Sequence, residues 1–171
     1  FLPATFADLS IWFYIWGLVT MIYGGAMALM QDDLKRLLAY SSISQMGYLL
    51  FGIGTISVLG LTGAEMMYVT HAIGKGILFM MAGIIIVKVG TRSISKLGGL
   101  AGKMPITAVC AVIGALTIMG IPPTAGFMGE WILFAGALET ALEEGSTLRA
   151  VGFGLGLVAT VLTMSYLLWM L

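Results

Sequence analysis

The sequence has 171 residues, of which 60% are hydrophobic and 9% are charged, against roughly 25% charged residues in an ordinary soluble domain. Its formal net charge is zero, so the strong basic patch of a nucleic-acid-binding protein is not indicated. A chain of this length cannot bury so many apolar residues in one soluble core. The composition therefore favours an integral membrane protein whose surroundings are the lipid bilayer, with no nucleic-acid partner.

Apolar segments follow one another along the chain, and each is long enough to cross a hydrocarbon core of about 30 Å as a helix. The five segments cover residues 11–30, 40–61, 66–89, 105–138 and 148–171. Helices are expected, because they let an open chain satisfy its backbone polar groups in lipid. The 24 glycines suit close helix packing. We predict an all-α bundle of about five transmembrane helices, forming a single membrane domain over residues 1–171.

The fourth segment is too long for one straight span, since residues 105–138 would reach about 51 Å as a helix. It contains Pro122 and Pro123, followed closely by Gly126. Consecutive prolines remove backbone donors and clash with the preceding turn, so the helix is expected to break there. Irregular backbone at membrane depth is tolerated where it is buried in protein or lines a wet cavity, and transporters place such breaks near ion sites.

Basic residues are unevenly distributed between the predicted loops. Residues 31–36 and 88–103 hold six Lys or Arg, whereas the loops of the opposite side hold only Arg149. The positive-inside rule places the two basic loops in the cytoplasm, with Phe1 outside and Leu171 inside. We therefore expect a protein of the inner (plasma) membrane of a cell. Because the sequence begins with Phe1 and its last residue lies in an apolar run, we also expect a fragment of a longer subunit.

Lys75 lies inside the third apolar segment, about 15 Å from its predicted start, where a charged lysine is costly and normally faces the bundle interior. Burial disfavours its charged form, which suits proton exchange. His71 lies one turn earlier on the same helix face, and histidine suits a relay. The alternative is a lysine paired with a carboxylate or backbone carbonyls, beside a histidine that bonds neighbouring helices.

Glu130 follows the predicted break in an otherwise apolar stretch. A carboxylate at that depth needs a partner or a proton, although a position at the outer interface would leave it solvated. In the second segment, Ser41 and Gln45 either support a polar path or bond between helices. No catalytic triad or metal-ligand spacing is readable, and Cys110 is a lone cysteine in an apolar block.

Three runs together resemble the antiporter-like subunits of respiratory complex I, Mrp cation/proton antiporters and membrane-bound hydrogenases. They are residues 31–48 (QDDLKRLLAYSSISQMGY), 70–76 (THAIGKG) and 120–130 (GIPPTAGFMGE). In that family two five-helix units form an inverted repeat, each with a broken helix. The resemblance covers nearly the whole chain and implies that it is the second unit, one half of the repeat.

The resemblance also implies roles. Lys75 would be the central proton-carrying lysine and His71 a relay beside it. Glu130 would be the terminal charged residue on the broken helix, a position that is lysine in some members and glutamate in others. Gln45 falls where some relatives have histidine. Other membrane subunits would be partners, and the redox centres, iron–sulfur clusters with a flavin or a nickel–iron site, would lie in partner subunits, with no cofactor or redox active site in this chain.

The leading hypothesis is thus proton or cation translocation as a subunit of a redox-driven pump of the respiratory-chain or hydrogenase type. One alternative is a subunit of an Mrp-type cation/proton antiporter without a redox partner. The other is a structural membrane scaffold in which the buried charges form a static network. Neutralising Lys75 would then harm assembly without changing coupling.

Overall fold

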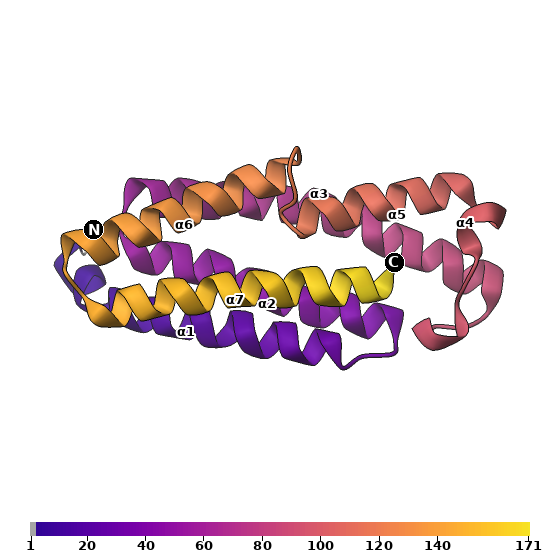
Figure 1. The fold of residues 1–171 in the computed structure, drawn as a ribbon, viewed down its shortest axis with the longest axis horizontal. Helices are drawn as coiled ribbons and strands as arrows, with labels where there is room; N and C mark the ends of the chain where they lie inside the picture. The colour runs from indigo at the N-terminus through magenta and orange to yellow at the C-terminus, as the bar shows by residue number, and fades with distance from the viewer. Residues whose placement is uncertain (1–2) are drawn as a thin grey trace.

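The structure is a computed structural model that describes residues 3–171; the predicted outer position of Phe1 concerns a residue outside this range. The described residues form seven α-helices and a short 3-10 turn. They are α1 (Pro3–Leu29), α2 (Leu34–Thr55), α3 (Val58–Val89), the 3-10 turn η1 (Ile94–Lys96), α4 (Leu100–Lys103), α5 (Pro105–Ile118), α6 (Ala125–Glu143) and α7 (Thr147–Met170). The long helices run side by side in an elongated bundle (Figure 1).

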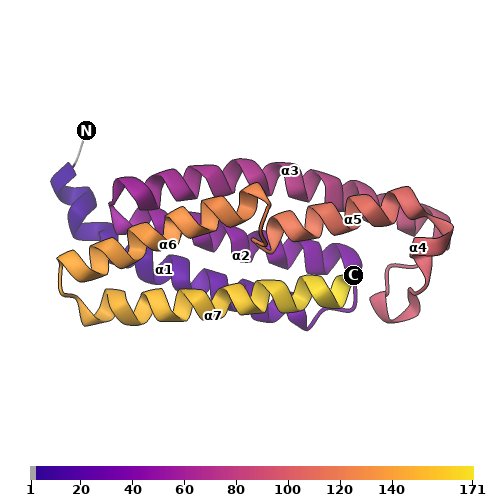
Figure 2. The same cartoon turned by 45° about the horizontal axis from the view of Figure 1, so that its top comes forward.

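Within the described residues, three helices are long and apolar enough to cross a membrane: Asp8–Leu29 of α1, α3 and α7. The 22-residue α2 packs along α1. The fourth predicted segment is divided into α5 and α6, which follow each other along the bundle with the break between them (Figure 2). The predicted all-α membrane bundle, with its fourth segment broken at Pro122-Pro123, is confirmed.

The turn between α2 and α3 differs from the expectation. Ile56 adopts a left-handed conformation with φ 55° and ends α2, and the Ser57 side chain accepts a hydrogen bond from Gly60 N at 2.9 Å. This cap starts α3 at Val58 rather than at 66. Glu65 therefore lies within α3, on its exposed surface, and Lys75 lies near the middle of the 32-residue helix.

The two basic loops meet at one end of the bundle. Leu34 N donates to Arg92 O at 2.9 Å, and Ile94 N donates to Asp32 O at 2.7 Å. The Asp32 carboxylate accepts from Ser93 Oγ at 2.5 Å and from Ser95 N at 2.8 Å. The hydrogen bond from Ser93 is the main cause that lowers the pKa of Asp32. These bonds hold residues 31–36 and 88–103 on the same side of the bundle.

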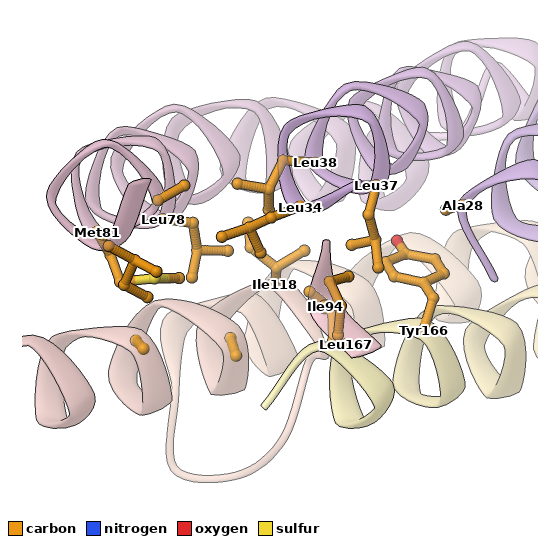
Figure 3. Close-up of a cluster of buried hydrophobic side chains, with 14 of the residues drawn as sticks. Ala28, Leu34, Leu37, Leu38, Leu78, Met81, Ile94, Ile118, Tyr166 and Leu167 are labelled. Carbon is orange, nitrogen blue, oxygen red and sulfur yellow. The ribbon is translucent and has the colours of Figure 1, made fainter. Parts of the chain in front are cut away.

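The apolar core consists of two clusters. The first lies near the basic loops and includes Leu37, Leu38, Leu78 and Ile118 (Figure 3). The second lies toward the other end, and its large members are Tyr14, Tyr48, Phe51, Leu133 and Phe134. On α2, α3 and α7, buried polar side chains lie between the residues of the first cluster and those of the second. The bundle thus contains a polar layer between two apolar clusters, formed by the buried side chains of Ser41, Ser44, Gln45, His71, Lys75, Glu130 and Thr163.

Candidate functional site

Lys75 of α3 is 6% exposed and faces α2. Its Nζ donates to Leu38 O at 3.1 Å and to Ser41 Oγ. Among the described residues, the salt bridge found joins Arg149 to Glu144, and Lys75 forms none. The Lys75 ammonium is instead held by a hydroxyl and a carbonyl. Ser41 was also predicted as a polar-path residue, and the helix register brings the two side chains together. A cation with neutral partners can lose its proton without leaving a carboxylate unpaired.

His71 lies one turn before Lys75, is 9% exposed, and interacts electrostatically with it. Its Nδ1 is buried and has no hydrogen-bond partner among the described residues. Buried polar atoms are nearly always paired, and an exception calls for an explanation. An unpaired ring nitrogen beside a buried amine is a potential proton acceptor.

Gln45 lies one turn after Ser41 on α2 and is 3% exposed. Its Nε2 donates to Ile118 O at 3.4 Å, and Ile118 is the last residue of α5. The broken helix leaves terminal carbonyls without intrahelical partners. Gln45 therefore connects the helix that contacts Lys75 to the end of the broken helix.

The break itself positions Glu130. Gly120 has φ +63°, and a Cβ at this position would collide with Glu130 Oε2. Glycine is required here both by the left-handed conformation and by the close approach of the carboxylate. At Gly126 a Cβ would collide with Thr117 O, so glycine also lets α6 start against the end of α5. The Pro122-Pro123 peptide bond in this segment is cis.

Glu130 of α6 is 9% exposed, which places it inside the bundle and not in the solvated position considered above. Its Oε1 accepts a hydrogen bond from Thr160 Oγ1 of α7 at 2.6 Å. It also borders an apolar groove of about 440 Å³ between α6 and α7. A buried carboxylate with one hydroxyl partner can bind and release a proton with little rearrangement of neighbours.

Hydroxyl groups that the sequence did not indicate lie between Lys75 and Glu130. Tyr48 Oη donates to Thr160 Oγ1 at 3.5 Å and lies 3.3 Å from Thr163 Oγ1. The Tyr166 hydroxyl interacts with Thr163 and Gln45, although none of these contacts reaches full hydrogen-bond geometry. A chain of polar side chains therefore runs from Ser41 and Gln45 to Glu130. The sequence signal for it was the three-residue spacing of Thr160, Thr163 and Tyr166 in an apolar helix.

Arg149 was expected in a loop but lies in the first turn of α7, 4% exposed. Its Nε donates to Glu144 Oε2 at 2.6 Å, Nη1 to Gly54 O at 3.0 Å, and Nη2 to Ser10 Oγ at 3.2 Å. The guanidinium also lies 5.4 Å from the centre of the Tyr14 ring. Arg149 thus joins α7 to α1 and α2 at the end of the bundle opposite the basic loops.

Residues that could hold a metal or redox cofactor do not gather in this site. Among the residues that the structure describes, no three His, Cys, Asp or Glu side chains lie close enough to bind one ion. Cys110 is exposed on α5. Lys75, His71 and Glu130 are the titratable groups of the polar layer, and hydroxyl groups lie between them.

Comparison with curated proteins identifies relatives named as subunits of NADH-quinone oxidoreductase and F(420)H(2) dehydrogenase. NADH-quinone oxidoreductase subunit N of Desulforudis audaxviator is 44% identical over 119 residues, which is 70% of this chain and 24% of that protein. F(420)H(2) dehydrogenase subunit M of Methanosarcina mazei is 39% identical over 153 residues, covering 90% of this chain and 29% of that protein. The chain spans between a quarter and a third of the length of such relatives.

Solved structures share the fold. A chain of the Mrp complex from Dietzia sp. DQ12-45-1b matches with a TM-score of 0.88 and 28% identity, covering 96% of this chain and 29% of that one. A chain of respiratory complex I from Thermus thermophilus matches with a TM-score of 0.85 and 28% identity, covering 97% and 34%. The family model described as "NADH:quinone oxidoreductase/Mrp antiporter, TM" matches residues 1–163. The chain therefore belongs to the transmembrane antiporter-like family of NADH:quinone oxidoreductases and Mrp antiporters.

Proposed function

We propose that this chain is part of a proton-translocating, antiporter-like subunit of a redox-driven membrane complex. The observation that carries the proposal is the polar layer, in which Lys75 and Glu130 are both buried and bond side chains of α2 and α7 respectively. The relatives named as subunits of NADH-quinone oxidoreductase and F(420)H(2) dehydrogenase support a redox-driven complex.

In this proposal Lys75 exchanges a proton with its surroundings, assisted by His71. Ser41, Gln45 and the hydroxyls of α2 and α7 provide the polar path toward Glu130, which is the second proton-binding group. The protonation of each group depends on the charge of the other, because titrating sites that interact share their proton equilibria. A change of charge imposed at one end of the layer would then move a proton at the other end.

Several features of the complete protein belong to the same proposal. The chain would be a single membrane domain and the second five-helix unit of a longer subunit, in keeping with the quarter to a third of each relative that it spans. The subunit would lie in an inner (plasma) membrane with residues 31–36 and 88–103 in the cytoplasm. Iron–sulfur clusters with a flavin or a nickel–iron site would be held by partner subunits.

An Mrp-type cation/proton antiporter subunit is the second candidate, favoured by the TM-score of 0.88 with a chain of an Mrp complex. The same residues would then move protons in exchange for a cation, without electron transfer in partner subunits. The two candidates differ in whether proton movement requires a redox substrate, which vesicles containing the intact complex can distinguish.

The test is Lys75→Met in the intact complex, reconstituted in vesicles with redox turnover and proton uptake measured together. We expect the complex to assemble and proton uptake per electron to fall at least tenfold, because methionine fills the space of lysine but carries no proton. Met80→Leu on the exposed side of the same helix is the control. Wild-type proton uptake in Lys75→Met would refute the role of Lys75 and favour the static scaffold.

A further inference from the structure

The structure contains a cavity of about 500 Å³ at the basic end of the bundle, away from the polar layer. Its walls are largely apolar and come from α3, α5 and α7, with contributions such as Met81, Ile85, Ala111 and Trp169. The loop from Ser95 to Leu100 forms the remaining side. The volume falls within the range of about 300–1,000 Å³ usual for ligand sites.

The residues that border the cavity are typical of the level where a membrane protein meets lipid headgroups. The cavity is bordered by Trp169 and Met170, at the end of the membrane-spanning α7. Trp169 is 55% exposed, and exposed tryptophans at the ends of spanning helices are typical of the membrane–water interface. The polar bonds of Asp32 with Ser93 and Ser95 mark the same end of the bundle.

Two lysines adjoin cavity-lining residues in the sequence, although neither lines the cavity itself. Lys96 lies between the lining residues Ser95 and Leu97, and Lys103 directly precedes the lining residue Met104. Residues 88–103 hold four Lys or Arg and no acidic residue. Lys96 and Lys103 are exposed and form no salt bridge within the part of the chain that the structure describes. An occupant should therefore combine an apolar chain with a negatively charged group.

We propose that this cavity binds an anionic phospholipid, with one acyl chain between α3, α5 and α7 and the headgroup phosphate held by Lys96 and Lys103. Basic pockets between transmembrane helices recognise anionic lipid headgroups in this way. A partner helix with an apolar face would fill the cavity but would leave Lys103, which forms no salt bridge within the described residues, without a counter-charge. This site is independent of the proposed proton path, since none of the polar-layer residues lines it.

The test uses the intact complex in detergent, incubated with phosphatidylglycerol that carries a photoreactive acyl chain, and maps the labelled residues by mass spectrometry. We expect labels on residues 94–112 and 169–171. Lys96→Gln with Lys103→Gln should lower this labelling at least threefold. Lys88→Gln with Arg92→Gln is an equal change of charge in the same loop, at positions with no cavity-lining neighbour in the sequence, and should leave the labelling unchanged.

A second pair of variants tests the apolar part of the site. Ala108→Phe adds a ring to a cavity-lining position and should abolish labelling, whereas Val109→Phe, on the exposed side of the same helix, should not. Photoreactive phosphatidylcholine should label the cavity at least threefold less than phosphatidylglycerol. The proposal is overturned by equal labelling with both lipids, by equal loss in both double variants, or by no labelling of the wild-type cavity, which would mean that protein covers it.

Discussion

Two buried cations, Lys75 and Arg149, occupy different regions of the bundle and have different partners. Arg149 is paired with the Glu144 carboxylate and also bonds a carbonyl and a hydroxyl from two other helices. Lys75 donates hydrogen bonds to a hydroxyl and a carbonyl. No carboxylate of the described residues lies within salt-bridge distance of its ammonium group. Arginine stays charged under all ordinary conditions, whereas a lysine shifts its protonation readily when buried. The comparison distinguishes a permanent structural charge from one suited to change during function.

The largest expected effect on stability comes from Arg149→Met. Removing the guanidinium leaves Gly54 O and Ser10 Oγ without this donor and should destabilise the subunit by about 3 kcal/mol. Lys75→Met should cost less, because it removes a donor from a hydroxyl and a carbonyl and leaves no carboxylate unpaired, whereas Arg149→Met also leaves Glu144 unpaired. SDS denaturation of the assembled complex measures both. Equal losses of stability would remove the distinction between the two cations.

The next effect concerns the Glu130 end of the polar layer. Gly120→Ala should cost about 1–2 kcal/mol from the left-handed backbone alone, and the added methyl group must displace the Glu130 carboxylate. Proton uptake per electron should fall with stability. Gly145→Ala is the matched control, since Gly145 also has a positive φ but no atom near its missing side chain. An effect on proton uptake from Gly145→Ala would contradict this interpretation.

Thr160→Val should have a smaller effect on stability, about 1 kcal/mol, because it removes one hydrogen bond to Glu130. Proton uptake per electron should nevertheless fall severalfold, since the hydroxyl joins Glu130 to Tyr48. Thr117→Val is the control, because the Thr117 hydroxyl is exposed and bonds only its own helix backbone, at Ile113 O. Unchanged proton uptake in Thr160→Val would exclude the α7 hydroxyls from the path.

The smallest effect involves a charge outside the membrane-spanning region. The lowered pKa of Asp32 means that its carboxylate stabilises the contact between the two basic loops above its ordinary pKa near 4. This contribution is lost as the pH falls through the lowered folded-state pKa. Hydrogen exchange of the Ser95 amide should therefore be protected at pH 6 and less so near pH 2 after correction for intrinsic rates. Asp32→Asn should reduce protection at pH 6.

Much of the fold could be predicted from the sequence because each apolar segment carries its own signal. The break at Pro122-Pro123 follows from local backbone chemistry in the same way. The predicted start of α3 was wrong, because the cap at Ser57 and the left-handed conformation of Ile56 allow a two-residue turn between two long helices. Length and hydropathy contain no information on so tight a turn.

The candidate site was predictable only as separate residues. Lys75, Ser41 and Glu130 stand out because polar groups in apolar helices are costly, but their partners depend on how the helices are registered. Neither the Lys75–Ser41 contact nor the Thr160–Glu130 bond follows from spacing within one helix. The burial of Arg149 was missed for the same reason, since its partners Ser10 and Gly54 lie on other helices.

The position of the polar layer between two apolar clusters has an electrical consequence. The clusters act as insulators on both sides of the layer, because an ion entering low-dielectric material loses its hydration. A proton in the layer is therefore separated from both aqueous phases unless one cluster is hydrated. Leakage down the electrochemical gradient would then be limited by the fully buried Leu37, Leu38 and Phe51, side chains that bind no proton themselves.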